Sequence, residues 1–286
     1  TLANEQWDPQ TKTIAFRTDE ESNKTQASDD YFLESSSRVH YFAEADALNE
    51  QGALLPKFQS NKLAALNKAG HGMHMIPGAF HDYATSDKLR NLVSELTWQD
   101  PVIPQSMYIF KQARIGGAVN SHQDSTFLYT TPRQSCLGLW LALDDATLEN
   151  GCLWVRPKSH VESVRRQLRR NVHYFGKDAI EQGSNIPHGD LSQPKMIMET
   201  LETDQHVSWE GLLPNGSEPP CLGLLEAGFI PVECNAGDLL CFPGELDHLS
   251  LPNTSHAPRH TFQLHLVEGP NAGVTWAKTN WLQYPK

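Results

Sequence analysis

The chain has no long hydrophobic run. No apolar stretch in its 286 residues approaches the roughly 18 to 20 residues that a helix needs to span a bilayer. No signal-peptide pattern opens the sequence either. We therefore expect a water-soluble protein with no membrane partner, located in the cytoplasm.

Basic residues are also few. The sequence contains 23 Lys and Arg against 34 Asp and Glu, which gives a formal net charge of −11. Such a charge repels phosphate backbones, so we expect no nucleic-acid partner and a small molecule as the substrate. The only strong basic cluster, "RRQLRR" from Arg165 to Arg170, is interpreted as the solvated face of a helix. We expect a monomer or a weak oligomer.

Cysteine is scarce and lacks a pattern. The five cysteines are scattered without CxxC or zinc-knuckle spacing (Cys136, Cys152, Cys221, Cys234 and Cys241). An odd, unpatterned set predicts neither a disulfide framework nor a cysteine metal site, and favours small buried hydrophobes in a reducing compartment. The sequence also lacks an internal repeat and a phosphate-binding glycine loop.

What is present is an ordinary globular mixture, with 39% hydrophobic and 20% charged residues. This length allows one large domain, and we assign residues 1–286 to a single one. Residues 1–35 are polar and without periodicity, which predicts a loop or cover. Apolar residues at 63, 66 and 69 followed by Gly70 and Gly72 predict a helix that ends at these glycines. Leu89, Leu92, Val93 and Leu96 predict an amphipathic helix over 87–98, so the N-terminal third is expected to be helical.

The pattern of apolar residues changes after Pro101. Short apolar or alternating runs such as "CLGLWLALDDA" and "RHTFQLHLVEG" are separated by Gly, Pro, Asn and Asp. This pattern is typical of a sandwich or barrel of antiparallel strands. Because helices precede strands, the fold class is α+β with a mainly β core. Residues 165–230 show little periodicity and are expected to form an insertion or lid within the domain.

A candidate metal site begins with His122-x-Asp124 in "SHQDSTFLY". Residues i and i+2 of a strand share a face, so the two side chains could meet at one point. The pattern alone is weak, because His188 and Asp190 repeat it in a Pro- and Gly-rich stretch that we expect to face solvent. Likewise, His71 and His74 have no carboxylate or cysteine companion and are interpreted as loop residues near a pocket.

The C-terminal block "GDLLCFPGELDHLSLPNTSHAPRHTFQLHL" separates these alternatives. A Gly-Asp turn leads into an apolar strand and then to His248, and Arg259 begins another alternating strand. Two histidines and one carboxylate form the facial triad of non-haem Fe(II) oxygenases, which leaves coordination positions open. A dicarboxylic cosubstrate also needs a partner for its far carboxylate, and the planar, permanently charged fork of an arginine suits it.

These blocks resemble the Fe(II)- and 2-oxoglutarate-dependent dioxygenases of the phytanoyl-CoA dioxygenase type. The resemblance extends from about Asp30 to Trp281. It is carried by "NKAGHGMH", "QSMYIFKQ", "SHQDSTFLYT", "LGLWLALDDATLENGCLWVRPKSH", the block that leads to His248, and the ending "VTWAKTNWLQ". It implies a double-stranded β-helix, a cupin-like jelly roll, with flanking N-terminal helices.

The resemblance also implies roles for individual residues. His122, Asp124 and His248 would bind Fe(II), and Arg259 would bind the tail of 2-oxoglutarate. The wall around this cosubstrate would include Lys68, Met107, Gln123, Trp140 and Ser250. The implied reaction consumes O₂, converts 2-oxoglutarate to succinate and CO₂, and hydroxylates a small-molecule substrate.

Three points stay open at this level. The departure "VRPKSH", with Arg156 and Lys158, and the long 165–230 stretch both lie where a substrate could be selected. On the last strand the polar alternate positions could line the pocket or face solvent. A non-oxidative cupin-like metal protein, or a pseudoenzyme that acts as an interaction module, is the alternative function.

Overall fold

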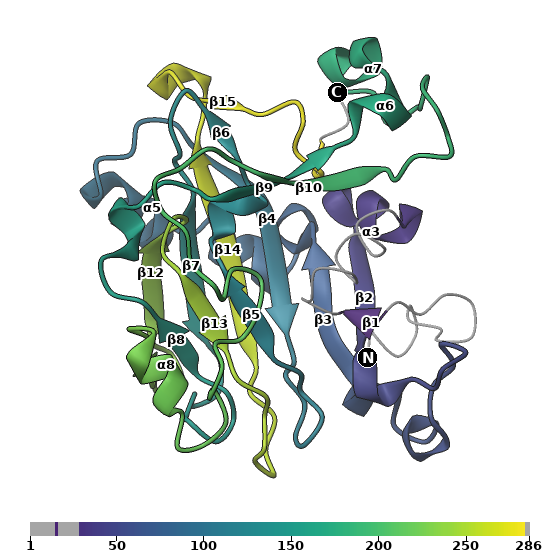
Figure 1. The fold of residues 1–286 in the computed structure, drawn as a ribbon. Helices are drawn as coiled ribbons and strands as arrows, with labels where there is room; N and C mark the ends of the chain where they lie inside the picture. Colours follow the sequence, from purple (N-terminus) through teal and green to yellow (C-terminus); the bar gives the residue numbers. More distant parts are fainter. Residues whose placement is uncertain (1–14, 17–28, 284–286) are drawn as a thin grey trace.

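The computed structural model describes residues 15–16 and 29–283 and combines short helices with mostly antiparallel sheets (Figure 1). The larger sheet has seven strands in the order β1-β2-β3-β4-β14-β7-β12. Their bounds are β1 Ala15–Phe16, β2 Val39–Glu44, β3 Leu66–His71, β4 Pro101–Ile109, β14 Thr261–Glu268, β7 Leu137–Ala142 and β12 Leu239–Pro243. Only the β1–β2 pair among these described strands is parallel.

A four-stranded sheet carries the candidate histidines. Its order is β11-β8-β13-β5, with bounds β11 Ile230–Val232, β8 Leu153–Val155, β13 His248–Ser250 and β5 Val119–His122. Two strand pairs complete the described part: β9 Arg166–Arg170 with β10 Met196–Thr200, and β6 Thr130–Thr131 with β15 Thr275–Trp276. The predicted combination of helices with antiparallel sheets is confirmed.

Strand β14 shows how alternation in the sequence divides the molecule. Phe262, Leu264 and Leu266 pack on one face of the large sheet against Ala84, Leu89 and Val93. These last three belong to the helices α4 (Ala79–Ala84) and α5 (Asp87–Glu95), which therefore cover that face. Gln263 and His265, at the alternate positions, line the cavity on the other face. The polar set of this strand therefore does not face solvent.

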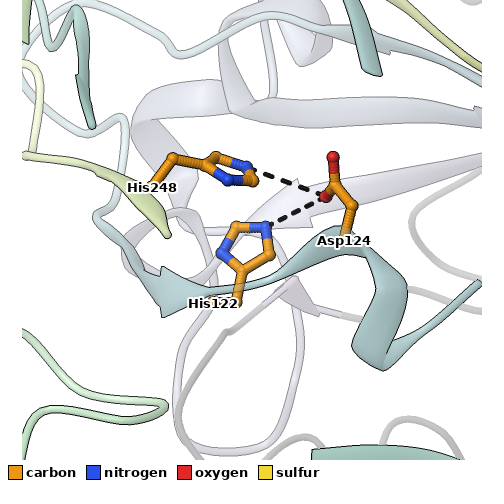
Figure 2. A group of neighbouring side chains, drawn as sticks. All are labelled: His122, Asp124 and His248. Atoms are coloured by element: carbon orange, nitrogen blue, oxygen red, sulfur yellow. Dashed lines mark ion pairs between the residues drawn. The ribbon is translucent and has the colours of Figure 1, made fainter. Parts of the chain in front are cut away.

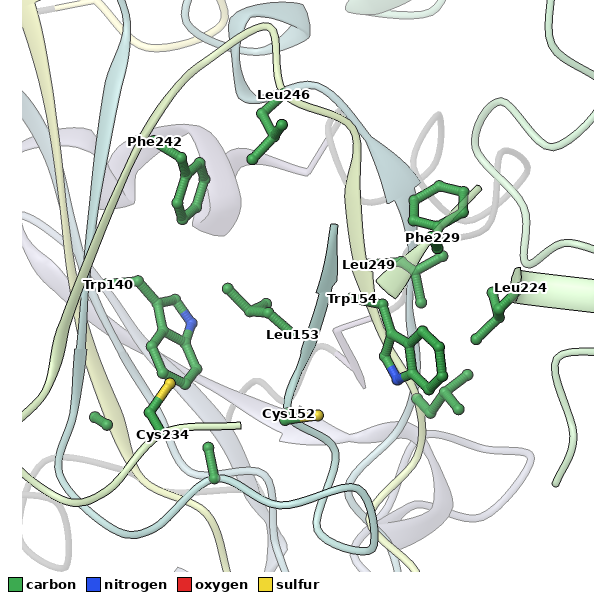
Figure 3. Close-up of a cluster of buried hydrophobic side chains, with 13 residues drawn as sticks. Trp140, Cys152, Leu153, Trp154, Leu224, Phe229, Cys234, Phe242, Leu246 and Leu249 are labelled. Atoms are coloured by element: carbon green, nitrogen blue, oxygen red, sulfur yellow. The ribbon is translucent and has the colours of Figure 1, made fainter. Parts of the chain in front are cut away.

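The two sheets enclose the main hydrophobic core. Trp140 of β7 and Phe242 of β12 meet Leu153 of β8 in this cluster, and Figure 3 shows the three side chains close together. Trp154 and Leu249 belong to the same cluster and form a second group with Leu224 and Phe229 in Figure 3. Of the cysteines, Cys136, Cys152 and Cys234 are buried as the sequence predicts, whereas Cys241 is exposed.

The N-terminal third is less helical than its sequence predicts. Helix α5 appears where expected, with Ser86 as its N-cap. Near the start, α3 (Asp30–Glu34) follows an Asp29 side chain that accepts a hydrogen bond from the backbone of Tyr31. Most of the polar segment 1–35 lies outside the described residues, so its predicted loop is not tested.

The helix predicted from positions 63, 66 and 69 is wrong. Only a short 3₁₀ turn, Lys62–Ala65, precedes strand β3, which runs through Gly70 between β2 and β4. All six residues of β3 are buried, so the strand has no wet face and shows no simple polar alternation. Gly70 allows a close approach to β4, because an added Cβ would lie 3.2 Å from Cγ of Met107.

Residues 165–230 are more regular than their sequence suggests. They form the antiparallel pair of β9 and β10, the helices α6 (Val172–Phe175) and α7 (Lys177–Gln182) between these two strands, and helix α8 (Leu222–Glu226). In Figure 1, α6 and α7 project from this strand pair at one end of the molecule. The solvated helix expected at "RRQLRR" is wrong, because this segment is strand β9 and Arg165 and Arg170 are buried. Within residues 15–16 and 29–283, no helix has the length and apolar character to cross a membrane.

Candidate metal centre

His122, Asp124 and His248 converge on one point (Figure 2). Each offers one ligand atom, and these atoms all lie within 4.8 Å of one another. Oδ1 of Asp124 lies 3.4 Å from Nε2 of His122 and 3.7 Å from Nε2 of His248. The structure thus brings together the three residues that the sequence singles out as a triad.

The small sheet positions this group. Strands β5 and β13 pair in antiparallel register with His248 opposite His122, which places both imidazoles on one face. The chain leaves β5 through Gln123 and turns into a single 3₁₀ turn, Asp124–Thr126. This turn directs the Asp124 carboxylate toward the two rings.

Backbone carbonyls fix the orientation of both imidazoles. Nδ1 of His122 lies 2.8 Å from the carbonyl oxygen of Asn120, and Nδ1 of His248 lies 3.0 Å from that of Leu246. A carbonyl only accepts, so in each ring Nδ1 carries the proton and donates it. The Nε2 lone pairs are therefore directed to the centre of the group, as metal-ligating histidines require.

The surroundings of Asp124 favour its ionised form. Burial by itself would raise the pKa of Asp124, but its histidine neighbours, His265 and His248 before His122, hold it well below its usual range. Burial and the nearby His122 lower the pKa of His248 to about 4. Burial also acts to lower the pKa of His122, but the hydrogen bond to Asp124 and its charge outweigh this and raise that pKa. Near neutral pH the group therefore offers one negative oxygen and a neutral His248, and a metal would displace any proton on Nε2 of His122.

A cavity of about 180 Å³ adjoins the triad. Four of the residues predicted around a cosubstrate line it, namely Lys68, Met107, Trp140 and Ser250, together with Arg259. Trp140 also belongs to the core cluster between the sheets. Its two roles are compatible because the ring forms part of the cavity wall.

Arg259 is the most unusual charge in this cavity. It is 2% exposed, and its Nε and Nη1 atoms have no hydrogen-bond partner among the described residues. Its guanidinium lies 5.1 Å from the centre of the Trp140 ring, and burial lowers its pKa to about 10. A buried cation with unused donors is costly, so the site is built for an anion.

Lys111 and Glu44 were not identified from the sequence, although Lys111 stands in the block "QSMYIFKQ". Nζ of Lys111 donates to the Gly117 carbonyl at 2.7 Å and to Oγ of Ser250 at 3.0 Å. Burial and the neighbouring Arg259 hold the pKa of Lys111 well below its usual range. Glu44 is buried beside Gly117 and accepts a hydrogen bond from its backbone. The sequence gives no sign of these two roles, because a single Lys or Glu is ordinarily exposed to solvent.

Lys68 is a cavity residue rather than a solvated one at a helix end. It lies in β3, is 2% exposed, and its Nζ lies 3.1 Å from Nε2 of His71. Nδ1 of His71 lies 2.7 Å from Oγ of Ser35. Burial lowers the pKa of Lys68 well below its usual range. His71 therefore belongs to the cavity wall and not to a loop, whereas His74 bonds Oγ of Ser106 outside it.

Three other residues considered in the sequence do not line the cavity. The amide of Gln123 donates to the Glu245 carbonyl at 2.9 Å and accepts from the Arg165 backbone at 3.0 Å. Gln123 is fully buried and is absent from the cavity lining. Its side chain braces the loop that carries Asp124, and its contact with a cosubstrate stays a prediction. His188 and Asp190 are exposed, as expected for their segment.

The chain is similar to proteins of one known family. The family model described as Phytanoyl-CoA dioxygenase (PhyH) matches residues 17–261. The chain belongs to the phytanoyl-CoA dioxygenase family. A protein of this family from Arabidopsis thaliana, named Phytanoyl-CoA dioxygenase, is 36% identical over 92% of this chain and 77% of its own length.

The sequence blocks resemble one member of the phytanoyl-CoA dioxygenase family in particular, phytanoyl-CoA dioxygenase domain-containing protein 1, and this is confirmed. The protein of that name from Danio rerio is 35% identical over 94% of this chain and 78% of its own length. Among solved structures, the iron-bound EctD from S. alaskensis has a TM-score of 0.47 and 18% identity, and covers 79% of this chain and 63% of its own.

Proposed function

We propose that this member of the family is an Fe(II)- and 2-oxoglutarate-dependent dioxygenase that hydroxylates a small molecule. One observation carries the proposal. The same buried cavity is lined by the group of His122, Asp124 and His248 and by Arg259. Nε and Nη1 of Arg259 have no hydrogen-bond partner among the described residues. A 2-oxodiacid that chelates a metal needs open coordination positions on that metal, and it needs a cation for its second carboxylate.

The donor set fits Fe(II). Two imidazole nitrogens and one carboxylate oxygen are the ligands of the facial triad in non-haem iron oxygenases. The hydrogen bonds from Nδ1 of His122 and His248 hold both rings with Nε2 inward. The pairing of a seven-stranded with a four-stranded sheet around this cavity supports a double-stranded β-helix as the finer description of the fold.

The chain's own residues would bind and orient the cosubstrate. Arg259 would take its far carboxylate, and Ser250, held by Lys111, would donate to the same group. Trp140, Met107 and Lys68 would close the wall around it. When bound, the iron would supply the activation of O₂ that couples formation of succinate and CO₂ to substrate hydroxylation.

The substrate side of the cavity has a mixed wall. Phe127, Leu168, Met198 and Trp281 supply apolar surface, and Arg166 and Glu210 of the 165–230 segment supply charge. This segment is proposed as the lid that excludes water and selects the substrate. Arg156 is paired with Glu162 and Asp247 and is not among the residues that line this cavity.

Succinate release tests the proposal. Purified protein with Fe(II), 2-oxoglutarate and O₂ is compared with the His122→Ala variant, first alone and then with a metabolite extract. We expect succinate from the wild type and a loss of more than about 100-fold in the variant, since mutations of metal ligands remove the centre itself. Equal rates would refute the site. Metal binding without any succinate would instead favour a cupin-like metal protein, and full biological function in an Asp124→Ala variant would favour an interaction module.

A further inference from the structure

The second oxygen of the Asp124 carboxylate has a partner of its own. Oδ1 faces the two histidines of the triad, whereas Oδ2 lies 3.2 Å from Nε2 of His265 on β14. Nδ1 of His265 in turn lies 3.4 Å from the amide nitrogen of Gln105 on β4. The three residues expose only 5 to 7% of their surface.

Strand register places this chain of contacts on the cavity face. His265 is directly opposite Gln105 on one side and Gly138 of β7 on the other, and residues opposite one another share a face. A Cβ at Gly138 would lie 3.2 Å from Oδ2 of Asp124 and 2.9 Å from the Phe242 ring. The missing side chain thus leaves the room in which His265 and Asp124 meet.

The chemistry of the donors sets the direction of each bond. An ionised carboxylate only accepts, so Nε2 of His265 carries the proton that lies toward Asp124. In the neutral ring Nδ1 is then an acceptor, and the Gln105 amide nitrogen, which only donates, satisfies it. The side-chain amide of Gln105 therefore selects the tautomer of His265, and His265 selects which oxygen of Asp124 remains for a metal.

We propose that His265 and Gln105 are positioning residues for the metal centre, which hold Asp124 so that it offers Oδ1 alone. This inference rests on the proposed function only in that Asp124 binds a metal. A protonated Nε2 cannot itself ligate a metal, so His265 is a donor to the ligand and not a fourth ligand. Partners of this kind tune affinity by about 10- to 100-fold in other metal sites.

Binding of Mn(II), a redox-stable substitute for Fe(II), to metal-free protein is the test, measured by isothermal titration. His265→Phe keeps the bulk of the ring and removes the donor, and we expect it to weaken Mn(II) binding about 10- to 100-fold. His265→Gln places an amide N–H near the former Nε2 and should recover most of the loss. Gln105→Leu frees the tautomer and should weaken binding less than His265→Phe. The matched control is His260→Gln, a half-buried histidine that bonds Tyr108 and does not line the cavity.

The outcomes separate this inference from the proposed function. If His122→Ala binds Mn(II) as the wild type does, the metal site itself is wrong. If His122→Ala abolishes binding while His265→Phe matches the wild type, only the positioning role is overturned. Equal losses in His265→Phe and His265→Gln would also overturn it, because a packing role would not distinguish them by their donor. Should His265→Phe fail to fold, wild-type affinity in Gln105→Leu would overturn the inference.

Discussion

The guanidinium of Arg165 lies against the carboxylate of Asp247, the residue that precedes His248. Nε of Arg165 also bonds Glu210 at 2.6 Å, and its backbone N–H bonds Gln123 at 3.0 Å. Gln123 stands between His122 and Asp124 in the chain. Arg165 thus joins the start of the proposed lid to both segments that carry the triad.

Removing this arginine should destabilise the fold. Arg165→Met leaves the fully buried Asp247 carboxylate with one cation fewer, and loss of a partner from a buried pair costs about 3 to 5 kcal/mol. Arg169→Met on the adjoining strand β9 is the control, because its ion pair with Glu199 is partly exposed and such pairs contribute about 0 to 1 kcal/mol. Urea unfolding measures both, and similar losses would contradict the assigned role of Arg165.

Arg259 should lower the stability of the ligand-free protein while it enables cosubstrate binding. Its guanidinium is buried with unused donors, so Arg259→Met is expected to unfold at the same temperature as the wild type or a higher one. The variant should lose affinity for 2-oxoglutarate by roughly 100-fold, the equivalent of about 3 kcal/mol. Thermal unfolding with and without 2-oxoglutarate checks both effects. A cosubstrate-induced shift that survives in Arg259→Met would show that the carboxylate is held elsewhere.

The metal should stabilise the folded protein through the triad. At a free concentration of 100 times its dissociation constant, a ligand specific for the folded state adds about 2.7 kcal/mol to the free energy of unfolding. We expect Mn(II) to raise the unfolding temperature and EDTA to reverse the rise. Asp124→Asn should show neither effect, and a full response in that variant would exclude Asp124 as a ligand.

Acid should weaken the fold partly through His74. Burial lowers its pKa from the usual 6.5 to about 4, so below pH 6.5 the unfolded chain binds a proton that the folded chain does not. The free energy of unfolding must then fall as the pH drops from 6.5 toward 4. His74→Gln should lose less stability over this range in urea titrations. Parallel curves for the two proteins would contradict this origin of the acid sensitivity.

The triad could be predicted from the sequence because the blocks that carry its residues resemble those of the phytanoyl-CoA dioxygenase family. "SHQD" and the turn before His248 are recognisable without a structure, and folding brings them into the register that pairs His122 with His248. Metal binding by these residues stays a prediction. The role of Arg259 was implied by the family resemblance. The alternation on the last strand left two orientations open, and only the structure places Gln263 and His265 in the cavity wall.

Other parts could not be predicted because tertiary contacts override local pattern. Strand β3 is buried on both faces, so its sequence does not alternate between exposed and buried residue types. The apolar residues at 63, 66 and 69 therefore indicated a helix instead. Arg170 of strand β9 is buried, and Arg165, just before this strand, is buried with two ion pairs, against the usual preference of this side chain for water. Gln105 and Lys111 gained their roles only from partners more than a hundred residues away in the chain.

A crystal structure of the protein grown without O₂, with Mn(II) and 2-oxoglutarate, would show directly whether the triad and Arg259 form one site. We expect Mn(II) bound by Nε2 of His122, Nε2 of His248 and Oδ1 of Asp124. We also expect 2-oxoglutarate chelated to the metal, with its far carboxylate on Arg259. Metal bound at other residues, or an Arg259 without a carboxylate beside a bound 2-oxoglutarate, would show that the proposed site is wrong.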